Sequence, residues 1–400
     1  MKKPVAGRVL MLLENGSFLG DVRVSHEANA LVSAGYKVSV ICVRRQQRPW
    51  RETVADVHVY RFPAPPGGDS FLGYILEYGY AMLAIFALSL LVLVREGFDV
   101  VHAHCPPDTL ALIGAFYKVL GKRFVFDHHD LGPEMYYYAR FKEGGNRRVY
   151  DALVAFEKLS CRLADRVIAT NDSFKAVEME RSGVPEDRIT VVRNGPDLEM
   201  LQPIEADPDL RKRAGTILGY VGTIGPQDGL DYLLRALHHL IYDLDRRDVF
   251  CVIMGSGKAL PRLSELAEEL AVDEYIWLTG RVGPEVRDRY LAATDICLDP
   301  DPSNPSNDRC TMIKMMEYMA LGKPVVAFDL PEHRVTAQDA AVYAPDNDEL
   351  EFARLIAMLM DDPALRQRMG QIGRKRIQEG LAWPYQAEQL VAAYATLFSK

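Results

Sequence analysis

The feature that most limits the fold is a repeated alternation of short apolar runs with longer segments of helical periodicity. A first series of runs begins with RVLMLL and ends with ITVVRNG; a second begins at Thr216 with TILGYVG and ends with AAVYAP. Such alternation is typical of parallel sheets covered by helices. Because 400 residues are too many for one core, we predict an α/β chain with two doubly wound, Rossmann-like domains facing a central cleft.

The domain boundaries follow from composition. We expect an N-terminal domain over residues 1–195 and a C-terminal domain over 214–380. The segment 196–213 contains prolines and several acids, which suits an interdomain linker. The last segment, 381–400, reads as an amphipathic helix, and we expect it to cross back to the N-terminal domain. Ligands of such folds bind beyond the carboxyl ends of the strands, so the cleft is the expected active site.

Charge and cysteine usage narrow the class of protein. Hydrophobic residues make up 48% and charged residues 26% of the chain, as in a soluble globular enzyme. The formal net charge of -8 argues against nonspecific nucleic-acid binding. The six cysteines form no C-x-x-C pair and several lie in apolar runs, which indicates buried thiols in a reducing compartment such as the cytoplasm.

One uncharged run, YGYAMLAIFALSLLVLV at residues 78–94, leaves two interpretations open. Its length falls just short of a comfortable membrane span. It could form a buried helix packed on a sheet. It could also form a helix, within 71–95, that rests in the inner face of a membrane and suits a lipid-linked acceptor.

Two strand ends in the first half carry candidate binding residues. A loop containing Gly20 leads from the first strand into a helix, whose N-terminal amides favour anions. The spacing is not G-x-G-x-x-G, so a dinucleotide site is not supported. At the end of a later strand, FDHHDLGPE brings together His128, His129, Asp130 and Glu134, polar groups expected to face a ligand. Without a third ligand at a recognisable spacing, a zinc site is not favoured.

The second half holds the most informative stretch, DPDPSNPSNDRCTMIKMMEYMALGKP. We predict one helix over residues 309–321, with Thr311, Lys314 and Glu317 on one side. Arg309 in the first turn opposes the helix dipole unless an anion binds there. The hypothesis is a diphosphate held by Arg309 and Lys314, with Glu317 accepting from ribose hydroxyls. The alternative is an internal Lys314–Glu317 ion pair on a solvated face. We interpret the D-x-D sequence at 299–301 as a structural turn.

Taken in order, the motifs resemble glycosyltransferase family 4, a family of retaining, nucleotide-sugar-dependent enzymes with the GT-B fold. The resemblance covers nearly the whole chain and rests on DVRVSHEANALVSAGYKVSVI, DVVHAH, DHHDLGPE, GYVGTIGPQDGLDYLLRAL and MEYMALGKPVVAFDLPEHR. The chain departs from the family pattern in two places. Arg309 stands where the first of two glutamates is common, and Thr223 and Asp228 stand where the family commonly has Arg and Lys.

The resemblance implies roles for individual residues. His129 would lie next to the transferring sugar, Glu317 would bind the ribose, and Arg281 and Val282 would follow the nucleobase. The expected catalytic residues are His129, Asp130, Arg309 and Lys314. The expected donor-binding residues are Gly20, Gly222, Thr223, Arg281, Val282, Thr311, Lys314 and Glu317. The expected acceptor-binding residues are Arg23, His128 and Glu134.

The predicted activity is therefore retaining transfer of a sugar from a UDP- or GDP-linked donor to a saccharide or lipid-linked acceptor, in polysaccharide or glycoconjugate synthesis. No metal is expected, provided that basic side chains and helix amides balance the leaving charge. Two alternatives stay open. A nucleotide-sugar epimerase of similar shape would use the same ribose and phosphate contacts, and a non-catalytic nucleotide-sugar-binding protein would fit the two departures.

Overall fold

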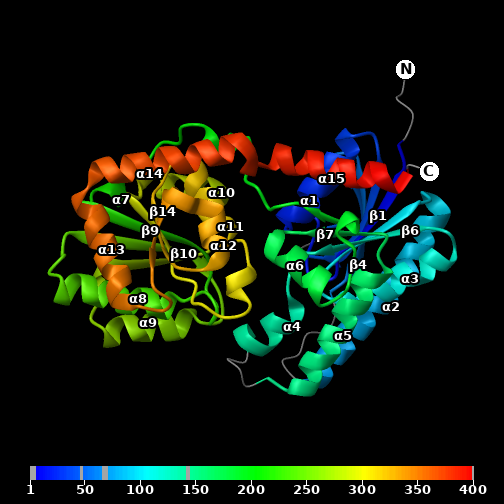
Figure 1. Ribbon diagram of the computed structural model, residues 1–400, viewed down its shortest axis with the longest axis horizontal. Helices are drawn as coiled ribbons and strands as arrows, with labels where there is room; N and C mark the ends of the chain where they lie inside the picture. Colours follow the sequence, from blue (N-terminus) through cyan, green and yellow to red (C-terminus); the bar gives the residue numbers. More distant parts are fainter. Residues whose placement is uncertain (1–5, 46–47, 65–70, 141–144, 399–400) are drawn as a thin grey trace. The chain divides into compact units, whose positions relative to one another are not determined.

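The computed structural model describes residues 6–45, 48–64, 71–140 and 145–398. They form two compact α/β units. The first consists of the described parts of Met1–Tyr137, Gly144–Asn194 and Tyr385–Lys400, and the second of those of Tyr138–Glu143 and Gly195–Pro384. Each unit has one sheet with helices on both sides (Figure 1).

The sheet of the first unit has the strand order β3-β4-β2-β1-β5-β6-β7-β8, parallel except for the antiparallel pair β3 and β4. The strands are β1 (Arg8–Leu12), β2 (Lys37–Arg44), β3 (Arg51–Val54), β4 (Val57–Pro63), β5 (Val100–His104), β6 (Arg123–His128), β7 (Arg166–Ala169) and β8 (Ile189–Val191). The helices are α1 (Val22–Ser33), α2 (Phe71–Arg95), α3 (Ala111–Val119), α4 (Gly132–Glu134), α5 (Arg147–Leu163), α6 (Asp172–Glu180) and α15 (Trp383–Phe398).

The sheet of the second unit has the order β11-β10-β9-β12-β13-β14 and is parallel throughout. Its strands are β9 (Thr216–Thr223), β10 (Val249–Ser256), β11 (Ile276–Gly280), β12 (Ile296–Asp299), β13 (Val325–Phe328) and β14 (Ala341–Ala344). Its helices are α7 (Pro208–Arg211), α8 (Leu230–His238), α9 (Leu260–Glu269), α10 (Pro284–Ala293), α11 (Ile313–Ala320), α12 (Pro331–Ala337), α13 (Glu349–Asp361) and α14 (Pro363–Arg376).

The sheet of the second unit separates two hydrophobic cores, because successive strand residues point to opposite faces. On β9, Leu218 and Tyr220 pack with α8, α9 and α13, whereas Ile217 packs with α10 and α11. A sheet buried on both faces explains why its strands read as continuous apolar runs. Two doubly wound α/β units therefore form, as the alternation predicted.

The segments outside the two sheets also have defined places. Residues 196–213, expected to be a linker, contain α7, and Leu210 of this helix is buried in a core of the second unit. The C-terminal helix α15 groups with the first unit from Tyr385 onward. Its Tyr394 hydroxyl lies 2.8 Å from Nδ1 of His102 on β5, and both side chains are buried. This polar contact fixes the end of the chain against the first sheet.

The apolar helix α2 is only partly buried. Over Leu76–Arg95 its mean hydropathy is 1.9, and 22% of the residues in its most apolar window are buried. Within the described residues it is the one helix long and apolar enough to cross a membrane by length and composition. The helix packs on β2 and β4, and its buried side chains include the stripe Ala81, Ile85, Ser89 and Val92. Of the two interpretations left open, packing on a sheet therefore holds for one face of the helix, while most of its residues are not buried.

Candidate functional site

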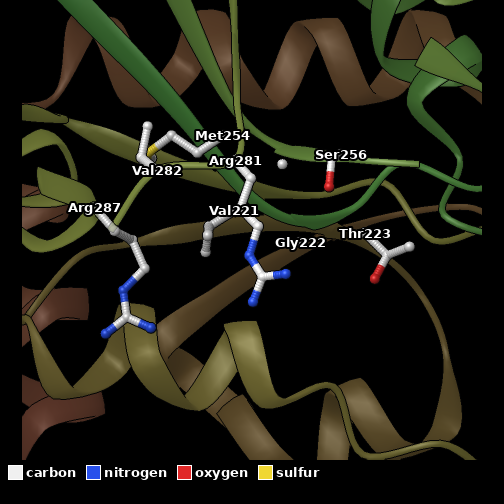
Figure 2. A pocket seen from close by; sticks show the side chains of 9 residues that line it. Val221, Gly222, Thr223, Met254, Ser256, Arg281, Val282 and Arg287 are labelled. Atoms are coloured by element: carbon white, nitrogen blue, oxygen red, sulfur yellow. The ribbon is translucent and has the colours of Figure 1, made fainter. Parts of the chain in front are cut away.

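The second unit has a pocket of about 420 Å³ at the carboxyl ends of its strands. It is formed by the ends of β9 and β10, by the turn after β11 and by α10. Ligands of parallel α/β sheets bind at this edge, where loops and helix N-termini meet. The lining residues are Val221, Gly222, Thr223, Met254, Gly255, Ser256, Arg281, Val282 and Arg287 (Figure 2). Four of the predicted donor-binding residues are thus brought together: Gly222, Thr223, Arg281 and Val282.

Two glycines keep the floor of the pocket open. A Cβ atom on Gly255 would lie 1.9 Å from the carbonyl oxygen of Gly222, so only glycine permits β9 and β10 to pair this closely at their ends. A Cβ on Gly222 would lie 2.7 Å from the hydroxyl oxygen of Tyr220. Because Gly222 and Gly255 carry no side chain, a ligand can approach the backbone directly at these two positions.

The positive charge of the pocket comes from two guanidinium groups. Figure 2 shows the side chains of Arg281 and Arg287 extending to the same side of the strand ends. Arginine holds anions and oxygen acceptors through several donors in a fixed planar arrangement. The hydroxyl groups of Thr223 and Ser256 add two donors or acceptors on the pocket wall. The pocket can therefore bind a polar ligand that carries negative charge.

Glu317 adjoins this pocket through Arg287. The Arg287 Nη1 atom lies 3.1 Å from Glu317 Oε1, and its Nε atom donates to Asp288 at 2.7 Å. Burial raises the pKa of Glu317, and the Arg287 charge opposes that rise. A carboxylate so placed can accept hydrogen bonds from ligand hydroxyl groups. Neither the residue pattern nor the family resemblance gave Arg287 a role, and only its place on α10 brings it to the pocket.

The predicted cationic helix is not formed. Asn307–Arg309 is a separate 3-10 turn, and α11 begins only at Ile313. The guanidinium of Arg309 donates to the carbonyl oxygen of Pro305 at 2.6 Å. Thr311, between the two segments, donates to Glu332 at 3.2 Å. The prediction that Arg309 occupies the first turn of a helix was therefore wrong, because the polar loop folds back on itself before the helix starts.

Lys314 is also placed differently from the hypothesis. Its ammonium group is buried, lies 3.3 Å from Asp299 Oδ1 and contacts Asp301 Oδ2. Although burial alone would lower the pKa of Lys314, these carboxylates hold it well above its usual value. The alternative, a Lys314–Glu317 pair on a solvated face, was wrong as well. The internal carboxylates already balance the Lys314 charge, and the D-x-D turn has a structural partner.

In the first unit, Asp127 at the end of β6 organises the polar residues. It accepts two hydrogen bonds from Arg23, from Nε at 2.7 Å and from Nη2 at 2.8 Å. Nδ1 of His104 lies 2.9 Å from the same carboxylate, and Nδ1 of His129 lies 3.4 Å from it. Although burial alone would raise the pKa of Asp127, the Arg23 guanidinium holds it well below its usual value. Arg23, predicted to bind the acceptor, is thus buried and engaged internally.

The residues after Asp127 divide between the interior and the strand end. His128 is fully buried, with Nδ1 3.1 Å from Glu178 Oε1. Glu134 is buried and pairs with Arg181. The prediction that these two side chains face a ligand was wrong. His128 ends β6 and points to the face opposite Asp127, and the Glu134 carboxylate is engaged by Arg181 inside the unit. The remaining first-unit candidates, His129, Asp130 and Gly20, keep exposed surface.

Metal-ligating residue types gather in two buried groups that no sequence spacing revealed. Within each group, one donor atom per residue lies within 4.8 Å of the others. The groups are Glu27, His102, His104 and Asp127 in the first unit, and Asp299, Asp301 and His333 in the second. Beside each group lies a cationic side chain that contacts the carboxylates of the group. Arg23 pairs with the first group and Lys314 with the second.

Comparison with known proteins agrees with this architecture. Residues 20–195 match the family model of the glycosyl transferase 4-like domain, and residues 215–362 match that of glycosyl transferases group 1. The chain is 26% identical to a D-inositol 3-phosphate glycosyltransferase of Kineococcus radiotolerans, over 94% of this chain and 89% of the relative. Its match to the same-named enzyme of Kribbella flavida is 29% identical and covers 58% of this chain but only 57% of that relative.

Solved structures share the fold at low sequence identity. Sucrose-phosphate synthase from Thermosynechococcus elongatus superposes with a TM-score of 0.78 at 18% identity, over 98% of this chain and 99% of that one. Anabaena HepE in complex with UDP and glucose superposes with a TM-score of 0.74 at 15% identity, over 98% and 100%. These neighbours establish the GT-B fold for the two units.

Proposed function

This chain belongs to the glycosyltransferases that join a glycosyl transferase 4-like domain to a group 1 domain, and we propose which donor and acceptor it uses. The donor is a nucleotide diphosphate sugar, and the acceptor is a saccharide or a lipid-linked saccharide. The observation that carries the proposal is the pocket of the second unit, where Gly222, Arg281 and Arg287 meet beside Glu317. The epimerase alternative is not favoured by the family match.

The pocket supports a nucleotide as the group that it holds. Bare backbone at Gly222 and Gly255 permits close contact with a flat or anionic group. Two guanidinium groups offer donors to phosphate or base oxygens, and Glu317 is placed to accept from ribose hydroxyls. HepE was solved with UDP and with glucose, which supports a uridine donor. A guanosine donor is the alternative that the experiment below distinguishes.

The proposed chemistry is transfer with retention of anomeric configuration and without a metal ion. The sugar becomes oxocarbenium-like as the diphosphate leaves, and the acceptor approaches the same face. The departing charge must be balanced by fixed positive groups. Since internal carboxylates balance the charge of Lys314, we assign this task to Arg281, Arg287 and backbone amides. His129 and Asp130, which retain exposed surface at the end of β6, are the candidates for contacting the sugar.

The proposed setting is polysaccharide or glycoconjugate synthesis in the cytoplasm, at the inner face of the membrane. All six cysteines are free thiols, and five of them are buried. Free buried thiols suit a reducing compartment. The apolar helix α2 supports membrane contact through residues 71–95.

The donor assignment is tested by thermal shift with a panel of UDP- and GDP-sugars. A ligand that binds only the native state stabilises it by about 2.7 kcal/mol at one hundred times its Kd. We expect one nucleotide series to raise the Tm, and Arg287→Ala to abolish that rise. Arg262→Ala is the matched control, since Arg262 is exposed and, within the described part of the chain, its ion pairs are with glutamates on its own helix. An unchanged Tm rise in Arg287→Ala would refute the pocket as the donor site.

Turnover is tested separately. Incubation of the donor with candidate acceptors, followed by NMR of the product, reports the anomeric configuration, and the same reaction with EDTA reports metal dependence. Retained configuration and full activity in EDTA are the expected results. Binding of the donor without turnover, across a broad acceptor panel, would instead support the non-catalytic alternative.

A further inference from the structure

Helix α2 presents a continuous apolar stripe to the outside of the first unit. Leu83, Leu90 and Val94 recur at helical spacing and are 74%, 40% and 85% exposed. The opposite stripe, which includes Ile85 and Val92, is fully buried. Isolated exposed apolar side chains are normal in soluble proteins, but an aligned series is not.

Helix α3 continues this apolar surface. Its Phe116 packs edge-on against Phe86 of α2 with ring centroids 5.0 Å apart, and Tyr117 hydrogen-bonds Ser89. The residues of α3 that face outward are again apolar, since Leu112, Phe116 and Val119 are all exposed, Val119 by 87%. We define the α2–α3 surface as Leu83, Leu90, Val94, Leu112, Phe116 and Val119.

Basic and aromatic residues lie at one end of the α2–α3 surface. Arg95 ends α2, and Lys122 and Arg123 follow the end of α3. Among the described residues, the ion pairs include none of these three. The Arg95 guanidinium lies 5.8 Å from the ring of Trp50, which is 46% exposed. Cationic side chains near a Trp ring, beside an apolar stripe, are typical of contact with lipid headgroups.

We infer that the α2–α3 surface rests on an anionic lipid bilayer, with both helices lying in the interface. The inference deepens the proposed function and rests on it in one respect, since it makes the acceptor a lipid-linked saccharide held at that bilayer. Helix α2 does not span the membrane, because its buried stripe packs on β2 and β4 and spanning would remove that stripe from the core. Anionic lipid is the occupant that matches the three basic side chains.

The experiment measures flotation of the full-length protein with vesicles, in the absence of any sugar. The vesicles contain phosphatidylcholine alone or with about 30% phosphatidylglycerol. We expect binding to the anionic vesicles and at least tenfold weaker binding for the double variant Leu83→Glu/Leu90→Glu. Met358→Glu is the matched control, because Met358 is 40% exposed on a helix of the second unit, and it should bind as the parent protein does.

A second variant tests the basic end of the surface. Arg95→Gln/Lys122→Gln/Arg123→Gln should reduce binding to anionic vesicles to the level seen with phosphatidylcholine alone. Circular dichroism shows whether each variant is folded. The donor-induced rise in Tm reports the pocket of the second unit and needs no lipid. Vesicle binding is measured without any sugar, so its outcome does not depend on whether the donor assignment is correct.

Three results would overturn the inference. One is equal vesicle binding by the Leu83→Glu/Leu90→Glu variant and the parent protein. Another is resistance of the bound protein to extraction by alkaline carbonate, which would indicate a spanning helix. The third is a stable dimer in light scattering without lipid that the same double variant dissociates, because a second copy would then cover the surface.

Discussion

Replacing Lys314 by Met should lower the stability of the second unit, and this effect should be present without any donor bound. The Lys314 ammonium lies 3.3 Å from Asp299 Oδ1 and contacts Asp301, and all three side chains are buried. At an effective dielectric constant of about 20, one such pair attracts by roughly 5 kcal/mol before desolvation is counted. Removing one partner of a buried ion pair typically costs about 3–5 kcal/mol, because the remaining charges lose their compensation.

The expected signature is a fall in Tm of the ligand-free protein. For a unit of this size each kcal/mol shifts the Tm by about 2–4 °C, so Lys314→Met should lower it by about 10 °C. Lys212→Met is the matched control. Lys212 is exposed and pairs with Asp209 at the surface, where an ion pair contributes at most about 1 kcal/mol.

A second substitution separates the structural role from a catalytic one. Burial disfavours the charged form of Asp301 by raising its pKa, and Lys314 opposes that rise. Asp301→Asn therefore removes a buried carboxyl group that has lost its compensating cation once the lysine is gone. The double variant Lys314→Met/Asp301→Asn should regain about half of the lost Tm. A Lys314→Met protein with an unchanged ligand-free Tm but no donor-induced rise would refute this reasoning and return Lys314 to the diphosphate.

Two further predictions concern a buried carboxyl group and the pocket floor. Burial raises the pKa of Asp108 from 3.8 to about 7, so the folded state holds this proton more tightly than the unfolded state does. Its stabilising contribution is present at low pH and is lost as the pH rises from about 4 to about 7; Asp108→Asn should therefore raise the Tm at pH 8 and leave it unchanged at pH 4, as calorimetry can check. Gly222→Ala should weaken donor binding about tenfold in titration calorimetry, since its Cβ would lie 2.7 Å from Tyr220. Gly79→Ala, with nothing within 4 Å, should bind the donor normally.

The sequence was sufficient for the fold and for much of the pocket. The apolar runs became strands because each is buried on both faces of a parallel sheet, a pattern that periodicity reveals directly. The family resemblance gave Gly222, Thr223, Arg281 and Val282 their expected roles. The structure brings them together because Gly222 and Thr223 end β9, Arg281 and Val282 follow β11, and the strand ends of one parallel sheet meet at one edge. The two pairs are far apart in the sequence, and the strand order of the sheet brings them to the same edge.

The partners of buried charges could not be predicted in the same way. The partners of Lys314 were not predicted, because its carboxylates come from the end of β12 and from the residues just after it. That segment was expected to be only a structural turn. Arg23 and Asp127 are 104 positions apart, and no spacing relates them. Arg287 had no expected role in the sequence. In each case the decisive contact joins different elements, so a charge in the sequence says little until the fold supplies its neighbour.

The two departures from the family pattern acquire a physical meaning from these contacts. Asp228, where the family commonly has a Lys, accepts from the backbone amide of Gly225 at 2.7 Å and so shapes the loop after β9. Thr223, where Arg is common, lines the pocket with a neutral hydroxyl. Positive charge is therefore absent from that loop, while Arg281 and Arg287 bring it to the same pocket from the turn after β11 and from α10. A leaving diphosphate requires compensation from some fixed cation. When the loop after β9 does not supply that cation, another element of the same pocket can.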